Sequence, residues 1–175
     1  MTTLYSATMS LDGFIAGPKG DMNWLTPYLG TDLGPEAADL VEEVGCLLVG
    51  GRTHRGDDPN AGTDSEGAFG GSYGGPAVVL SRTLDRTQPG VDLVTSDVRT
   101  AVDRATELAA GRYVNILGAE TARSCHDAGL LDEILVFIAP VLLGYGTRLF
   151  ERPGGQRVRL ARKPGTAAHW YRVLR

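Results

Sequence analysis

Three short polar segments, each placed directly after a predicted strand, carry the residues of this 175-residue chain that could bind a ligand. Glycine lets a ligand approach the backbone, arginine and hydroxyl side chains bind phosphate, and a helix N-terminus offers free N–H groups to an anion. Ligands bind beyond the carboxyl ends of the strands in open α/β sheets, so segments that meet there would suit a dinucleotide phosphate. The segments are Gly50-Gly51-Arg52-Thr53, Ser81-Arg82-Thr83 and Gly118-Ala119-Glu120-Thr121.

Each segment taken alone also has an ordinary structural explanation. A Gly-Gly pair after a strand is commonly a turn, a Ser-Arg pair is commonly a solvated loop, and none of the three is a GxGxxG fingerprint or a Walker loop. His54, His126 and His169 lack the spacing of metal ligands, and neither Cys46 nor Cys125 has the basic neighbours of a reactive thiolate. We therefore expect no metal site. The three segments indicate a ligand-binding site only if the fold brings them together.

The elements that must position these segments are alternating strands and helices. Apolar residues at i, i+3, i+4 and i+7 predict helices, and continuous apolar runs such as Cys46-Leu-Leu-Val49 predict strands buried on both faces. This alternation indicates one α/β domain over residues 1–175, with a mainly parallel sheet covered on both faces and an antiparallel C-terminal hairpin. The predicted strands span 3–9, 46–49, 77–80, 92–95, 113–117, 133–139, 156–162 and 167–174, and the predicted helices span 35–44, 97–110 and 119–128.

Two long connections lack such periodicity. Residues 17–34 are interrupted by glycine and proline and predict an irregular loop. Residues 56–76 hold seven glycines, four acidic residues and no basic residue. Because that composition cannot bury enough apolar surface to order a segment, we expect a mobile surface loop there.

The overall composition excludes several classes of protein. Lys and Arg number 17 and Asp and Glu number 21, and the resulting net charge of −4 argues against general nucleic-acid binding. No run approaches the roughly 20 apolar residues of a membrane span. Two cysteines are too few for a secreted disulfide scaffold, and the first residues do not form a signal peptide. We expect a cytoplasmic protein with no nucleic-acid or membrane partner.

The segment Ser10-Leu-Asp-Gly-Phe-Ile-Ala-Gly17 resembles the opening signature of the dihydrofolate reductase-like superfamily. More closely, the chain is similar to the reductase domain of the bifunctional deaminase-reductases of riboflavin biosynthesis. The resemblance implies a dihydrofolate reductase-like three-layer α/β/α fold, a homodimer to which the apolar run 134–143 contributes, and an NADPH-dependent reductase of a small heterocyclic substrate. It spans residues 5–150 in the right order, through Gly51-Arg52-Thr53, Val79-Leu80-Ser81-Arg82, Ile116-Leu-Gly-Ala119, Gly129-Leu-Leu-Asp-Glu-Ile134 and Pro140-Val-Leu-Leu-Gly-Tyr-Gly-Thr-Arg-Leu-Phe150.

The resemblance also implies roles for individual residues toward NADPH. The first segment would hold the pyrophosphate and the 2′-phosphate end, the second would flank the 2′-phosphate, and the third would cover the pyrophosphate. The backbone near Thr8 and Ile15 would meet the nicotinamide carboxamide. The cofactor residues expected in this way are Thr8, Ile15, Gly51, Arg52, Thr53, Ser81, Arg82, Gly118, Ala119, Glu120 and Thr121.

On the substrate side, the loop at 16–24 would be a lid beside the nicotinamide, with Ser10 and Trp24 at the substrate. Asp12 would be the catalytic residue that orients the substrate or relays a proton, unless it only forms the turn before Gly13. Trp24 has the alternative of anchoring the loop. Two further acids on the first helix, residues 36 and 39, are open candidates for the acid that protonates folate in authentic dihydrofolate reductases.

Two departures from the resemblance bear on the substrate. The riboflavin-pathway reductases carry a lysine where this chain has Ser6, and their phosphate-binding arginine segment corresponds to the acidic stretch 56–76. A phosphorylated pyrimidine would be repelled there. The sequence therefore leaves the physiological substrate open, and it leaves a second hypothesis, an NADP(H)-binding module without turnover that acts as a sensor or structural partner.

Overall fold

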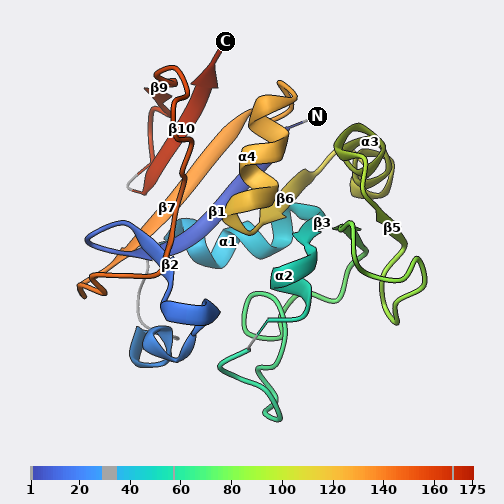
Figure 1. The fold of residues 1–175 in the computed structure, drawn as a ribbon, viewed down its shortest axis with the longest axis horizontal. Coiled ribbons are helices and arrows are strands. Elements are labelled where there is room, and N and C mark those ends of the chain that lie inside the picture. Colours follow the sequence, from blue (N-terminus) through green and yellow to red (C-terminus); the bar gives the residue numbers. More distant parts are fainter. Residues whose placement is uncertain (1, 29–34, 57, 167) are drawn as a thin grey trace.

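The computed structural model describes residues 2–28, 35–56, 58–166 and 168–175, and an eight-stranded sheet runs through its centre (Figure 1). Its strands are β1 (Thr3–Ser10), β3 (Val44–Gly50), β4 (Ala77–Leu80), β5 (Leu93–Thr95), β6 (Tyr113–Leu117), β7 (Glu133–Ala139), β9 (Arg159–Arg162) and β10 (His169–Leu174). They lie in the order β5-β4-β3-β6-β1-β7-β10-β9. Neighbours from β5 to β7 pair in parallel, whereas β10 pairs antiparallel with both β7 and β9. The mainly parallel sheet and the C-terminal hairpin are confirmed.

Helices cover both faces of this sheet. α1 (Pro35–Glu43) lies on one face, and α3 (Val98–Ala109) and α4 (Ala119–Asp127) lie on the other (Figure 1). Alternating side chains of the strands divide the core accordingly, because Leu4 packs in the cluster beneath α1 and Tyr5 packs in the cluster beneath α3 and α4. The molecule therefore has the three layers expected of a dihydrofolate reductase-like fold. None of the helices in the described ranges has the length and apolar character of a membrane span.

Several short elements were not predicted. β2 (Phe14–Ala16) and β8 (Thr147–Arg148) form a second, two-stranded antiparallel sheet. The other short elements are the 3₁₀ helices η1 (Pro18–Gly20) and η2 (Asn23–Tyr28), and α2 (Gly51–His54) directly after β3. Elements of two to six residues are too short to show a helical or strand period in the sequence.

The junction between α1 and β3 differs from the sequence-based expectation. The pattern predicts a helix to Val44 that Gly45 ends, but the helix ends at Glu43 and β3 already includes both residues. A Cβ on Gly45 would lie 2.2 Å from the carbonyl oxygen of Ala109, in the last turn of α3. The pairing of β3 with β6 also shifts register here. Close packing of α3 on the strand therefore explains this glycine.

The segment 56–76 contains no helix or strand among its described residues, but it is not a bare surface loop. Phe69 and Tyr73 pack against the apolar cluster beneath α1. The carboxylates of Asp58 and Glu66 accept hydrogen bonds from backbone N–H groups of the same segment. The segment is therefore a largely exposed surface loop, as predicted, and Phe69 and Tyr73 attach it to the core while hydrogen bonds within the segment fix its turns.

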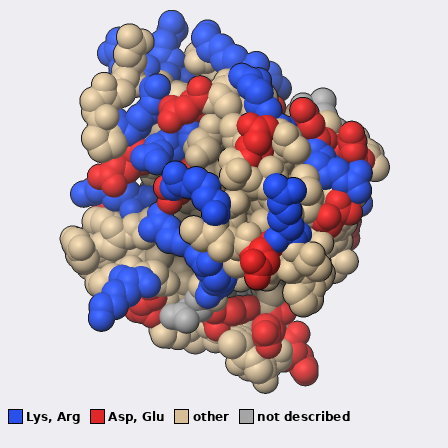
Figure 2. Space-filling model, turned by 45° about the vertical axis from the view of Figure 1, so that its right-hand side comes forward, with Lys and Arg blue, Asp and Glu red and all other residues tan. Residues whose placement is uncertain are grey.

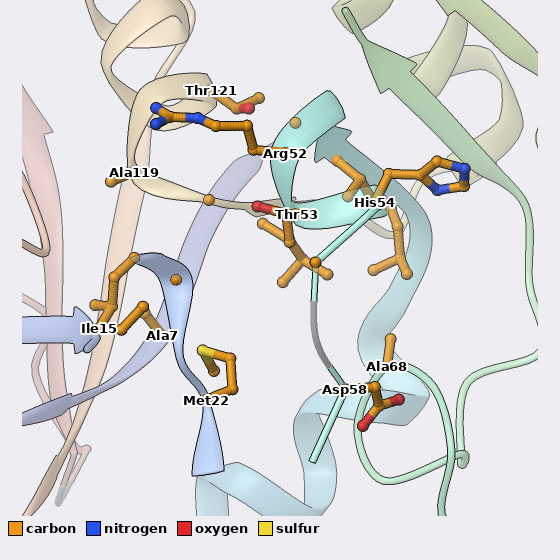
Figure 3. Close-up of a pocket in the computed structure, with 18 of the residues that line it drawn as sticks. Ala7, Ile15, Met22, Arg52, Thr53, His54, Asp58, Ala68, Ala119 and Thr121 are labelled. Carbon is orange, nitrogen blue, oxygen red and sulfur yellow. The ribbon is translucent and has the colours of Figure 1, made fainter. Parts of the chain in front are cut away.

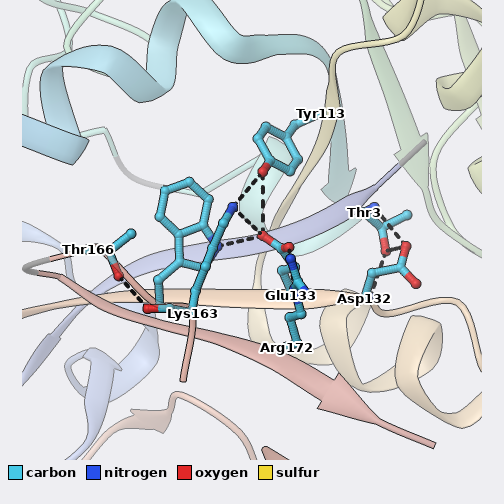
Figure 4. Close-up of polar contacts among 8 residues, drawn as sticks. Thr3, Tyr113, Asp132, Glu133, Lys163, Thr166 and Arg172 are labelled. Atoms are coloured by element: carbon cyan, nitrogen blue, oxygen red, sulfur yellow. Dashed lines mark hydrogen bonds and ion pairs between the residues drawn. The ribbon is translucent and has the colours of Figure 1, made fainter. Parts of the chain in front are cut away.

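A buried carboxylate joins the C-terminal hairpin to the sheet (Figure 4). Glu133 accepts hydrogen bonds from Nε1 of Trp170 at 2.7 Å and from Nζ of Lys163 at 3.1 Å. The ammonium group of Lys163 also donates to the Tyr113 hydroxyl at 3.0 Å and lies 3.8 Å from the Trp170 ring centroid. Tyr113 and Glu133 begin β6 and β7, so this cluster lies at the amino ends of the strands, away from the three candidate segments.

The apolar run 134–143 is predicted from the sequence to be a core strand or an interface strand. Its residues up to Ala139 form β7, which pairs with β1 on one side and β10 on the other. Leu135, Val136 and Phe137 are buried in this position. The strand part of the run therefore belongs to the core rather than to an interface.

Candidate active site

The three polar segments that follow β3, β4 and β6 meet at one edge of the sheet. β3 lies between β4 and β6, and the three strands run parallel, so their carboxyl ends lie together. Gly50 at the end of β3 is in register with Leu80 of β4, and Val49 is in register with Leu117 of β6. The segments 50–53, 81–83 and 118–121 are therefore neighbours in space, as predicted.

Glycines of one segment face hydroxyl groups of another. A Cβ on Gly51 would lie 2.5 Å from Oγ of Ser81, and a Cβ on Gly118 would lie 2.6 Å from Oγ1 of Thr53. Because these distances are far shorter than ordinary carbon–oxygen contacts, the hydroxyls occupy space that only glycine leaves free. The three segments thus interlock, and their backbones remain open to a ligand.

The N-terminus of α4 adds backbone donors to this edge. Gly118 is its N-cap, with φ +102 and no side chain to accept from the first turn. The first N–H groups of a helix have no partner within the helix, so they can bind an anion. Thr121 follows in the same turn, and its Oγ1 lies 2.5 Å from the position that a Cβ on Gly50 would take.

Arginines surround the same edge. Arg52 forms an ion pair with Glu120, and Arg55 donates a hydrogen bond from Nη1 to the Thr83 hydroxyl at 3.4 Å. Arg82 is exposed and makes no hydrogen bond or ion pair with any described residue. Hydroxyl, backbone N–H and guanidinium groups are the donors that phosphate requires, so this edge fits a phosphorylated cofactor. Arg55 was missed in the sequence, where it falls outside the three segments.

A cavity of about 2940 Å³ opens at this edge and extends over the α1 face of the sheet (Figure 3). Figure 3 shows Arg52, Thr53 and Thr121 at one end, with Ala7 and Ile15 on a neighbouring wall. All residues assigned to the cofactor from the sequence line this one cavity. They are Thr8, Ile15, Gly51, Arg52, Thr53, Ser81, Arg82, Gly118, Ala119, Glu120 and Thr121.

Comparison with known proteins assigns the family. The sequence profile of the RibD C-terminal domain matches residues 2–167, nearly the whole chain. The chain belongs to the RibD C-terminal domain family. This membership confirms the resemblance seen in the sequence and makes the chain an oxidoreductase of the RibD reductase type, a family expected to use a nicotinamide cofactor. No curated protein matches the chain.

Solved structures share the fold. A protein of Shewanella sp. PV-4 named for riboflavin biosynthesis is 22% identical, with a TM-score of 0.70 and 100% of both chains covered. A pyrimidine reductase-like protein of Corynebacterium diphtheriae is 14% identical, with a TM-score of 0.54, over 99% of this chain and 92% of that one. A deaminase/5-amino-6-(5-phosphoribosylamino)uracil reductase of Thermotoga maritima is 15% identical, with a TM-score of 0.52, over 98% of this chain and 55% of that one.

Ser10 and Asp12, predicted for the substrate side of this RibD-type domain, are not among the described residues that line the cavity. The Ser10 hydroxyl donates to Asp12 Oδ1 at 2.6 Å and accepts from the Phe14 N–H at 3.0 Å. The carboxylate of Asp12 also accepts from the N–H groups of Leu143 at 3.1 Å and Gly144 at 2.7 Å. The bond from Ser10, with these two, lowers the pKa of Asp12 to about 2. The bonds of Asp12 therefore join the turn 10–13 to the loop after β7, in agreement with the structural alternative predicted for this residue.

The other residues predicted for the substrate side also do not line the cavity. Trp24 belongs to η2 and lies against Tyr28, with ring centroids 6.5 Å apart, and it does not line the cavity. Its neighbours Met22 and Leu25 line the cavity instead, so the lid region contributes apolar contacts through other residues. Neither of the two acids on α1, residues 36 and 39, is among the described lining residues.

The wall of the cavity near Thr8 and Ile15 contains residues that the sequence analysis did not assign. Ser6 and Phe137 line the cavity from β1 and β7, and Leu40 lines it from α1. Side chains two residues apart in a strand point to the same face of the sheet. Ser6 therefore shares the α1 face with Leu4 and Thr8. This parity was readable from the sequence, but the choice of face depends on where the helices pack.

A buried side-chain amide lies on the same face of the sheet. Asn115 on β6 is in register with Leu4 of β1 and Leu47 of β3, and it shares the parity of Tyr113 and Leu117. It is fully buried, and neither its amide nitrogen nor its amide oxygen has a hydrogen-bond partner among the described residues. Leaving such a group unpaired costs about 1–3 kcal/mol, so this position is a weak point of the core.

Proposed function

We propose that the chain is an NADPH-dependent reductase of a small heterocyclic substrate of the pyrimidine or pterin type. The observation that carries the proposal is the meeting of the segments 50–53, 81–83 and 118–121 in one cavity that Thr8 and Ile15 also line. NADPH would supply the hydride that reduces a C=N or C=O carbon, while the nitrogen or oxygen takes up a proton.

The residues of this chain would bind and orient that cofactor. The Arg52 guanidinium and the N–H groups at the start of α4 would neutralise the pyrophosphate, and Thr53 and Thr121 would donate hydroxyl groups to it. Thr8 and Ile15 would hold the nicotinamide through their backbone. Met22, Leu25 and the other apolar lining residues would exclude water from the hydride path.

Selection of NADPH over NADH would rest on the arginines near β4. The 2′-phosphate carries about two negative charges at pH 7, so it needs cations that the ribose of NADH does not need. Arg82 has no hydrogen-bond or ion-pair partner among the described residues. Arg55 donates a hydrogen bond to the hydroxyl of Thr83, which directly follows Arg82 in the chain. Both are available to a phosphate placed beside Ser81.

Charge reversal at Arg82 tests this assignment. We expect Arg82→Glu to weaken NADPH binding by roughly ten-fold or more, the size of one charge-assisted contact, and to leave NADH binding unchanged. The matched control is Arg86→Glu, an exposed arginine of the same loop that does not line the cavity, which should change neither affinity. Fluorescence titration of both cofactors measures the result. Equal losses for the two cofactors, or none for either, would contradict the proposal.

A homodimer also stays a prediction for this domain. It is supported by three exposed apolar side chains, Leu11, Leu142 and Tyr145, of which 64%, 68% and 72% is exposed. They lie on neighbouring segments, because the N–H of Leu11 donates to the carbonyl of Val141 at 2.8 Å. Light scattering of the purified chain measures the oligomeric state. A cytoplasmic location likewise stays a prediction from the sequence.

A further inference from the structure

The two ends of the cavity differ in charge. The end formed by the three cofactor segments and the start of α3 carries four arginines and two carboxylates, namely Arg52, Arg55, Arg82, Arg123, Asp97 and Glu120. The end formed by η1, α1 and the segment 58–72 carries one lysine and three carboxylates, namely Lys19, Glu42, Asp58 and Glu66. A phosphorylated cofactor suits the first end, so the substrate would occupy the second.

Two of these carboxylates are fixed in place by the backbone of segment 58–72. Asp58 accepts from the N–H of Asn60 at 2.8 Å and from the N–H of Gly67 at 2.6 Å. Glu66 accepts from the N–H of Gly62 at 2.8 Å. Neither forms an ion pair with a described lysine or arginine. Their negative charges are therefore held beside the cavity without a neutralising partner.

The position of this segment is set by the core. Phe69 packs against the apolar cluster beneath α1, and Ala68, Phe69 and Asp58 all line the cavity. Figure 3 shows Asp58 and Ala68 at the opposite end of the cavity from Arg52 and Thr121. Figure 2 shows acidic side chains at the lower end of the molecule, where Figure 1 places this segment.

The cations nearest to this end do not offset the carboxylates. Arg55 precedes the segment, but its guanidinium bonds to Thr83, on the cofactor side. Lys19 lines the cavity in η1 and is exposed, as Glu66 is, so solvent and salt screen both charges, and one ammonium group stands against three carboxylates at this end. An anionic group placed between Met22 and Asp58 would meet more negative than positive charge.

Resting on the proposed function, we propose that the substrate of this reductase carries no phosphate or other anionic group. Its substrate class is a neutral or cationic heterocycle, and Asp58 and Glu66 act as specificity-determining residues that reject anionic analogues. The carboxylates of Asp58 and Glu66 would repel a phosphate, less so in high salt because Glu66 is exposed, whereas the same heterocycle without its phosphate has no negative charge for them to repel.

A matched pair of probes tests the inference: 5-amino-6-(5-phosphoribosylamino)uracil and its riboside without the phosphate. We expect kcat/KM of the riboside to exceed that of the phosphorylated probe by roughly ten-fold or more at low salt, the order of a like-charge penalty. The ratio should fall toward one in 0.5 M salt and in the variant Asp58→Asn/Glu66→Gln. The control Asp64→Asn, an exposed acid of the same segment that does not line the cavity, should leave the ratio unchanged.

Calorimetric binding of both probes to the NADP⁺-saturated protein measures the same ratio without turnover. Should the double variant fail to fold, Glu66→Gln alone is the fallback, because only one of its carboxylate oxygens accepts a backbone bond. A wild-type protein that prefers the phosphorylated probe, that binds neither probe, or whose ratio is unchanged in the variant overturns the inference. NADPH binding is measured first, because its absence would instead overturn the proposed function.

Discussion

Replacing Gly118 by alanine perturbs the centre of the edge that we propose binds the cofactor, and it does so in two ways. The glycine has φ +102 and ψ 133, a conformation that L side chains rarely adopt. The added Cβ would also lie 2.6 Å from Oγ1 of Thr53, so the hydroxyl must move away from the segment that it faces. Both effects act at the N-cap of α4, where the backbone N–H groups would meet the pyrophosphate.

The expected magnitudes follow from these contacts. A non-glycine residue in such a conformation costs about 1–3 kcal/mol, which lowers the free energy of unfolding by that amount. Displacing the Thr53 hydroxyl and turning the first N–H groups of α4 removes at least one hydrogen bond to a charged group, worth about 1.5–3 kcal/mol. We therefore expect the dissociation constant for NADPH to rise by about ten- to a hundred-fold.

Gly129 provides the matched control. It also has a positive φ, +72, but a Cβ there would meet no atom within 4 Å, and it does not line the cavity. Gly129→Ala should lower stability by about 1–2 kcal/mol through backbone strain alone and leave NADPH binding unchanged. Urea unfolding and fluorescence titration measure both quantities. If Gly118→Ala bound NADPH as tightly as the wild type does, the assignment of this edge to the cofactor would be wrong.

Three further predictions concern the scaffold around the site. Asp12 has its folded-state pKa lowered from 3.8 to about 2, so its stabilisation is complete above pH 4 and is lost as the pH falls toward 2. Asp12→Asn should therefore lower the Tm at pH 6, with a gap to the wild type that narrows below pH 4, and a gap independent of pH would refute this role. Asn115→Leu should raise the free energy of unfolding by about 1–3 kcal/mol, because it removes an unpaired buried amide, and a loss of stability in urea would count against that reading. Gly45→Ala should lower the free energy of unfolding by about 3 kcal/mol or more, because the added Cβ would meet the backbone carbonyl of Ala109, which cannot move aside as a flexible side chain can. Wild-type stability of this variant in the same assay would disprove the close packing.

Much of the fold was predictable because local pattern and tertiary structure agree. The strands at 77–80, 113–117 and 133–139 have the predicted bounds, and α3 and α4 end within one residue of theirs. Apolar runs and helical periods of this length carry a strong signal in the sequence. The meeting of the three polar segments was predictable for a related reason, because parallel strands place their carboxyl ends at one edge whatever the details of packing.

The residues on the substrate side of the cavity were less predictable, because the sequence gives the type of each residue but not the direction in which its side chain points. Asp-Gly in a turn and a tryptophan in a loop are equally compatible with a catalytic role and a structural role. Only the coordinates show that Asp12 accepts bonds from Leu143 and Gly144, 131 and 132 positions away, and that Met22 rather than Trp24 faces the cavity.

By itself, the sequence determined the three-layer architecture, the order of the strands along the chain and the three polar segments that follow β3, β4 and β6. Those features depend on short-range periodicity and on the parallel arrangement that alternating strands and helices produce. The tertiary structure alone decided which face of the sheet the cavity uses, that the acidic segment forms part of its wall, and that the buried amide of Asn115 has no partner among the described residues. These features arise from contacts between residues far apart in the chain, which no local pattern encodes.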